Sequence, residues 1–71
     1  MQVKQITVAN YPIRLGQFLK LAAIVQDGIE AKILIQSGKI KIDGHIETRR
    51  GRQLEKNNTV QLEHGTIYVL T

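Results

Sequence analysis

Cysteine is absent from this chain of 71 residues, so neither a disulfide framework nor a thiolate metal site is available to it. That absence suits a reducing compartment. No apolar run approaches the ~20 residues that cross a bilayer, and the opening segment MQVKQITV lacks the basic start and apolar block of a secretory signal. We therefore expect a cytoplasmic protein that does not engage a membrane.

Aromatic side chains are also scarce, at 4% of the chain with no tryptophan. Phe18 falls on an apolar helical stripe and Tyr68 in a terminal strand, so we expect no platform on which single-stranded bases stack. Ser37 is the only serine, and no glycine-rich loop precedes a Lys-Ser or Lys-Thr pair. His45 and His64 are isolated from each other. The chain therefore looks unlike an enzyme, and we expect no metal site and no cofactor.

Positive charge is present in excess and is concentrated in one segment. The net charge is +4, and residues 39–52 contribute +3 of it, from five basic residues against Asp43 and Glu47. A localised basic patch is the electrostatic signature of a phosphate-binding surface. Charge alone does not separate that interpretation from a solvated face without a ligand.

The apolar pattern of the first half predicts a strand followed by a helix. Met1–Ala9 alternates loosely and is rich in β-branched residues, which is typical of a strand. Apolar residues at helical spacing then predict a helix from about residue 13 or 14 to Ala23. The stripe that would face the core consists of Leu15, Phe18, Leu19 and Ala22.

A second helix is predicted from a capping box at Asp27 and Glu30, in which each residue would bond the backbone of the other. The helix should run to about Ser37, with Gly38 as its left-handed C-cap. Its inner stripe contains Ala31, Leu34 and Ile35. Ile29 and Ile33 widen that stripe, so we expect this helix to be buried on more than one side.

The second half predicts two hairpins. Lys39–Asp43 alternates as a strand and ends at Asp43-Gly44, a pair typical of a type I′ turn. Thr48–Arg52 has no apolar residue and should be an exposed loop. After a turn at Asn57-Asn58, a second hairpin is expected from Thr59–Glu63 and Thr66–Leu70. The predicted order is β-α-α-β-β-β-β over a single domain of residues 1–71. It is an α+β fold with two helices on a small, mainly antiparallel sheet.

Two separated motifs resemble a known family. The first is Ala31-x-x-Leu34-Ile35-x-x-Gly38-x-Ile40-x-Ile42-Asp43-Gly44, and the second is Arg14-Leu15 followed by Phe18-Leu19-Lys20. Both are similar to the S-four-type RNA-binding domain, named for the fourth protein of the ribosomal small subunit. The segment TRRGR is similar to that of small stand-alone bacterial members. The likeness covers Ile13 to about Leu62, and it implies an αL-type RNA-binding motif. Many members begin the second helix with Ser-Arg, whereas this chain has Asp27-Gly28 or Gly28-Ile29 there.

The arginines of residues 48–52 are the best candidates for binding, because a planar guanidinium matches a phosphate in a bidentate manner. The alternative is that they pair with Glu47 or Glu55. Arg14 matches the family motif, but it could instead pair with Asp27 or Glu30. The complete set of candidate RNA-binding residues is Arg14, Lys32, Lys39, Lys41, His45, Arg49, Arg50 and Arg52.

These observations predict a monomeric module that binds structured RNA, either ribosomal or transfer RNA, through a basic helix–hairpin–loop face. The resemblance implies a role in ribosome assembly or translation, with the ribosome as a partner. The alternative is a protein-interaction module that uses the same basic patch or a sheet edge.

Overall fold

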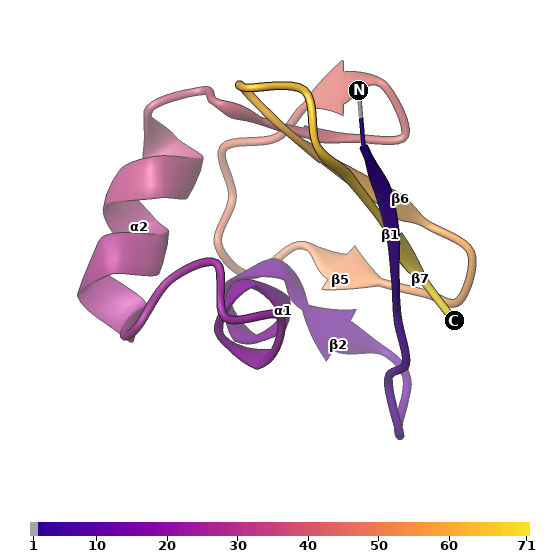
Figure 1. Cartoon of the computed structure of the whole chain (residues 1–71). Coiled ribbons are helices and arrows are strands. Elements are labelled where there is room, and N and C mark those ends of the chain that lie inside the picture. Colours follow the sequence, from indigo (N-terminus) through magenta and orange to yellow (C-terminus); the bar gives the residue numbers. More distant parts are fainter. Residues whose placement is uncertain (1) are drawn as a thin grey trace.

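The computed structural model of the chain describes residues 2–71 (Figure 1). Two helices lie beside one mixed sheet, and a short ladder of two strands lies apart from that sheet. The elements in chain order are β1 (Val3–Ile6), β2 (Ile13–Arg14), α1 (Leu15–Leu21), α2 (Gly28–Gln36), β3 (Ile40–Ile42), β4 (His45–Ile46), β5 (Gln53–Leu54), β6 (Thr59–Leu62) and β7 (Ile67–Leu70).

The main sheet has five strands in the order β1-β7-β6-β3-β4. β1 pairs with β7 in parallel, and the other neighbours are antiparallel. The α+β class and the mainly antiparallel sheet predicted from the sequence are therefore confirmed. The turn between β3 and β4 is also as predicted, because Asp43 and Gly44 have φ of 50° and 87°, as a type I′ turn requires.

One face of the sheet packs against the helices, since the inward residues of β3, β6 and β7 alternate with exposed or half-exposed ones. From α1, the predicted residues Leu15, Phe18 and Leu19 are fully buried. The ring of Phe18 contacts that of Tyr68 edge-on at 6.5 Å between centroids. Both predicted hairpins and the first helical stripe therefore build a common core.

Several sequence-based predictions need correction. The first helix begins at Leu15, because Ile13 and Arg14 are extended and pair with β5, and it ends at Leu21 rather than Ala23. The first strand is shorter than predicted and covers Val3–Ile6; Met1, at the start of the predicted range, lies outside the described residues.

Another correction concerns α2. Ala31 and Ile35 are buried as predicted, but Ile29 and Ile33 are 72% and 66% exposed. Ala31 and Ile35 on one face of the helix belong to the core cluster, whereas Ile29 and Ile33 on the other face stay exposed. The expectation that α2 is buried on more than one side was wrong. Within residues 2–71, neither helix is long and apolar enough to cross a membrane.

The predicted N-cap of α2 is present, since the Asp27 carboxylate accepts a hydrogen bond from the Glu30 backbone N–H at 2.8 Å. The reciprocal contact from the Glu30 side chain is not formed in the described part of the chain. Replacing Asp27 by alanine should lower the free energy of unfolding by about 1 kcal/mol, because an N–H of the first turn loses its partner. Urea denaturation of D27A measures this loss of stability. The control is Q26A, because Gln26 is an exposed neighbour whose side chain does not cap the helix. Equal stability of the two variants would contradict it.

Candidate nucleic-acid interface

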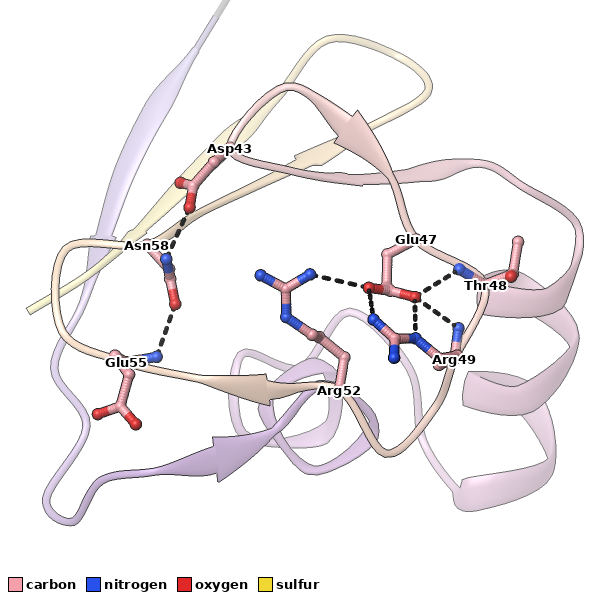
Figure 2. A network of polar contacts seen from close by, with 7 residues as sticks. All are labelled: Asp43, Glu47, Thr48, Arg49, Arg52, Glu55 and Asn58. Atoms are coloured by element: carbon pink, nitrogen blue, oxygen red, sulfur yellow. Dashed lines mark hydrogen bonds and ion pairs between the residues drawn. The ribbon is translucent and has the colours of Figure 1, made fainter.

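The segment of residues 47–52 connects β4 to β5, and we call it the arginine loop. Its first residue, Glu47, is only 6% exposed, and its carboxylate is surrounded by donors (Figure 2). The backbone N–H groups of Thr48 and Arg49 donate to Oε2 at 3.1 and 3.0 Å. The Arg49 side chain donates through Nε to Oε2 at 3.0 Å and through Nη2 to Oε1 at 3.1 Å. Arg52 Nη1 donates to Oε1 at 2.9 Å.

These donors stabilise the charged form of the carboxylate. Hydrogen bonds from the Arg49 side chain, with further ones from Arg52 and the Arg49 backbone, lower the pKa of Glu47 from 4.5 to about 2, although burial acts in the opposite direction. The same contact raises the pKa of Arg49. Glu47 is therefore ionised at every physiological pH, and the guanidinium groups of Arg49 and Arg52 have a fixed anchor.

The arginine loop is also attached to the start of α1. The Leu15 N–H donates to the Arg52 carbonyl at 2.8 Å, and the Gly16 N–H donates to the Arg50 carbonyl at 3.1 Å. A Cβ atom at position 16 would lie 3.1 Å from Arg50 Cγ. The glycine therefore allows the aliphatic part of Arg50 to lie directly against the helix.

A hollow of about 310 Å³ lies where the loop meets both helices, and we call it the basic groove. Its three cations come from three different elements: Arg14 from β2, Lys20 from α1 and Arg50 from the arginine loop. No acidic residue is among those that line it. The groove is lined by Arg14, Gly16, Gln17, Lys20, Gly28, Ala31, Arg50 and Gly51. Three basic side chains facing one open hollow without a carboxylate form a surface suited to a phosphate group.

The structure brings together some of the residues predicted from the sequence and separates others. Arg14 and Arg50 share the basic groove. Lys32 is exposed one helical turn after Gly28, but it is not among the residues that line the groove. Arg49 and Arg52 bind Glu47, which was the alternative considered for them, while Glu55 takes no part. Among residues 2–71, no acid forms an ion pair with Arg14.

Lys39 and Lys41 lie at a second hollow, between β3 and β6, which also contains Glu63. Lys39 Nζ lies 3.7 Å from the Glu63 carboxylate, in a pair whose side chains are 51% and 69% exposed. Such an exposed pair contributes about 0–1 kcal/mol and leaves the lysine available. His45 is exposed on β4. No cluster of three or more metal-ligating residues occurs in the described part of the chain.

Six of the residues that line the groove were not among the sequence candidates, and two of them, Lys20 and Gly16, matter for its charge and shape. Lys20 belongs to the motif that carried the family resemblance. It follows Gly16 by four residues, and this spacing places both residues on the same face of α1. Gly16 itself was interpreted only as a tolerated glycine of the first helical turn. Its contact with Arg50 joins segments more than thirty residues apart and has no local sequence signal.

The combination of a helix pair, a tight hairpin and a basic loop occurs in known proteins. A family model described as the S4 domain matches residues 6–70. This chain belongs to the S4 domain family. The match covers nearly all of the chain, including both helices and the arginine loop. The resemblance inferred from the two sequence motifs is thereby confirmed.

Similar proteins are known from several bacteria. The probable ribosome maturation protein RlbA of Bacillus subtilis is 36% identical over 58 residues, which cover 82% of each chain. YbcJ of Escherichia coli, named as a candidate RNA-binding protein, is 33% identical over 58 residues, or 82% of this chain and 83% of that one. A tyrosine–tRNA ligase of Burkholderia lata is 34% identical over 58 residues that form 14% of its own length.

The solution structure of YbcJ superposes on this S4 domain with a TM-score of 0.66 and 31% identity, covering 92% of this chain and 85% of YbcJ. That structure was described as revealing an αL motif involved in RNA binding. The chain is therefore an S4-type RNA-binding domain with the fold of YbcJ.

The depressed pKa of Glu47 predicts how stability depends on pH. Because the folded pKa of about 2 lies below the ordinary 4.5, the carboxylate contributes stability above about pH 4.5 and loses it as pH falls through 2. The stability advantage of wild type over E47Q should therefore shrink between pH 5 and pH 2. The loss should be about 1–2 kcal/mol, less than the full pKa shift implies, because solvent screens the exposed arginine.

Denaturant unfolding of both proteins across this pH range measures the difference, and taking the difference cancels the titration of the other carboxyl groups. An advantage that stays constant down to pH 2 would show that Glu47 has an ordinary pKa in the folded protein.

Proposed function

We propose that residues 1–71 act as a single, monomeric module that binds phosphates of structured RNA in the basic groove. The observation that carries this proposal is the convergence of Arg14, Lys20 and Arg50 on one hollow that no acid lines. Lys32, one helical turn after Gly28, and Arg49, next to Arg50 in the arginine loop, would extend the positive surface. Lys39, Lys41 and His45 provide a second set of contacts for a longer RNA.

The shape of the site favours folded RNA over single strands. The aromatic rings Phe18 and Tyr68 are buried in the core, so no exposed pair of rings is available among them for stacking bases. Recognition would rest on phosphates and 2′-hydroxyl groups, which double-helical RNA displays across its shallow minor groove. Arginine also suits such contacts because its donors are arranged in a planar fork.

The natural RNA would be ribosomal or transfer RNA. This proposal is supported by the names of the relatives, which include a probable ribosome maturation protein and a tyrosine–tRNA ligase. A module of this size can act by occupying one site on a ribosomal subunit during maturation. We propose this role, with the ribosome as the partner.

Removing a cation from the basic groove should lower the affinity for RNA. It should also make that affinity less sensitive to salt. About four or five phosphate contacts predict a slope of log K against log salt of about −3 to −4. R50Q should bind structured RNA about tenfold more weakly at low salt and lose about 0.7–0.9 from that slope. Filter binding or fluorescence anisotropy at several salt concentrations measures both quantities.

The matched control is K4Q, which makes the same change of charge on β1 away from the groove. It should change affinity only slightly. If R50Q and K4Q behave alike, the protein responds to net charge and the groove has no special role.

Gly16→Ala separates stability from binding. Alanine favours the helix by about 1 kcal/mol over glycine, so the variant should unfold at an equal or higher denaturant concentration. Its Cβ would lie 3.1 Å from Arg50 Cγ, so that side chain has to shift within the groove to make room. RNA affinity should therefore fall about three- to tenfold, which is the loss of part of one charged contact. Unchanged affinity in a stable G16A protein would contradict the placement of Arg50.

A protein-interaction module is the second candidate, because Ile29 and Ile33 are exposed on α2 and β1 forms an open sheet edge. Ribonuclease treatment of complexes isolated from cells distinguishes the two functions. Loss of the complex after treatment supports RNA as the partner, whereas a complex that survives treatment supports a protein.

A further inference from the structure

The arginine loop contains one acidic residue, and its position is unexpected for a surface that binds a polyanion. Glu47 is 6% exposed and is the first residue of the segment that supplies Arg49, Arg50 and Arg52. A carboxylate there repels phosphate, so by charge alone it should weaken binding. Its five hydrogen bonds indicate a different role.

We infer that Glu47 is a positioning residue for RNA binding, which rests on the function proposed above. Its carboxylate binds the backbone of Thr48 and Arg49 and the side chains of Arg49 and Arg52, so it fixes both ends of the turn that contains Arg50. The turn then delivers Arg50 to the basic groove.

The backbone contacts with α1 show how the ordered loop reaches its site. Arg52 is held at its side chain by Glu47 and at its carbonyl by the Leu15 N–H, at 2.9 and 2.8 Å. The Arg50 carbonyl accepts from the Gly16 N–H at 3.1 Å. A loop released from Glu47 would keep its arginines but lose one of its two sets of anchors. RNA would then have to order the loop as it binds, which lowers affinity.

The hydrogen bonds to the Glu47 carboxylate, which we call the clamp, leave part of the Arg49 side chain free for a ligand. This side chain is 73% exposed although its Nε and Nη2 atoms bind Glu47. The five N–H donors of a guanidinium all lie in its plane, and those on the edges that do not face Glu47 remain available. Arg49 is thereby held in one orientation with donors that still face solvent, which is the arrangement a phosphate contact needs.

The positioning role predicts a result opposite in sign to simple electrostatics. Glu47→Gln removes a negative charge, which alone would tighten RNA binding. Loss of the clamp should instead weaken RNA binding by about tenfold. This is the middle of the range for residues that are coupled in one hydrogen-bond network. The salt slope should also become less steep by about one phosphate contact, 0.7–0.9.

The matched control is Glu55→Gln. It removes the same charge immediately after β5, and Figure 2 shows its carboxylate directed away from the cluster around Glu47. E55Q should bind structured RNA with unchanged or slightly higher affinity. The experiment measures Kd and salt slope for wild type, E47Q and E55Q by anisotropy with one folded RNA, together with amide hydrogen exchange at Gly16, which should become faster in E47Q.

Each outcome decides a separate point. Weaker binding by E47Q with faster exchange at Gly16, while E55Q is unaffected, supports the positioning role. E47Q that binds as tightly as E55Q overturns it.

If E47Q does not fold, Glu47→Asp replaces it, because aspartate keeps the charge but withdraws the carboxylate by one methylene. Unchanged affinity in E47D overturns the inference, and reduced affinity supports it. Wild-type protein that does not bind RNA at low salt overturns the proposed function itself.

Discussion

The arrangement of the candidate interface depends on one buried carboxylate. Glu47 accepts hydrogen bonds from two backbone N–H groups and two guanidinium groups, and they lower its pKa to about 2. A charged group is costly to bury unless its partners are complete, so the loop around it has little freedom to rearrange. A segment that would otherwise be a flexible, self-repelling run of arginines becomes a defined structure.

The core positions this loop in relation to the helices. β5, which follows the loop, pairs with β2. The backbone N–H groups of Leu15 and Gly16 in α1 donate hydrogen bonds to carbonyl groups of the loop. Leu15 is fully buried, so the helix that carries Lys20 and the strand that carries Arg14 are fixed to the same core. The three cations of the basic groove thus come from two separate segments of the chain, with Arg14 and Lys20 in one and Arg50 in the other, but rest on one framework. Such a framework suits binding of a rigid ligand, because little has to be ordered when the complex forms.

Local patterns predicted most of the fold, and tertiary contacts explain what they missed. The hairpins, the cap at Asp27 and the stripe of α1 follow from spacing and turn chemistry, which act over a few residues. β2 was missed because two extended residues become a strand only when β5 lies beside them. Ile29 and Ile33 follow an apolar pattern, yet in the fold their side chains remain 72% and 66% exposed. For the site, charge identified the arginines, but the division between those that bind Glu47 and the one at the groove depends on three-dimensional contacts.

Membership of the S4 domain family and the geometry of the basic groove support our proposal that RNA binds where β2, α1, α2 and the arginine loop meet. Amide chemical-shift mapping during titration with a folded ribosomal RNA fragment tests it most directly. We predict that the largest, salt-sensitive changes occur at Arg14, Gly16, Lys20 and Arg50. Changes confined to the open face of the sheet, around Gln61 and Ile67, would contradict it.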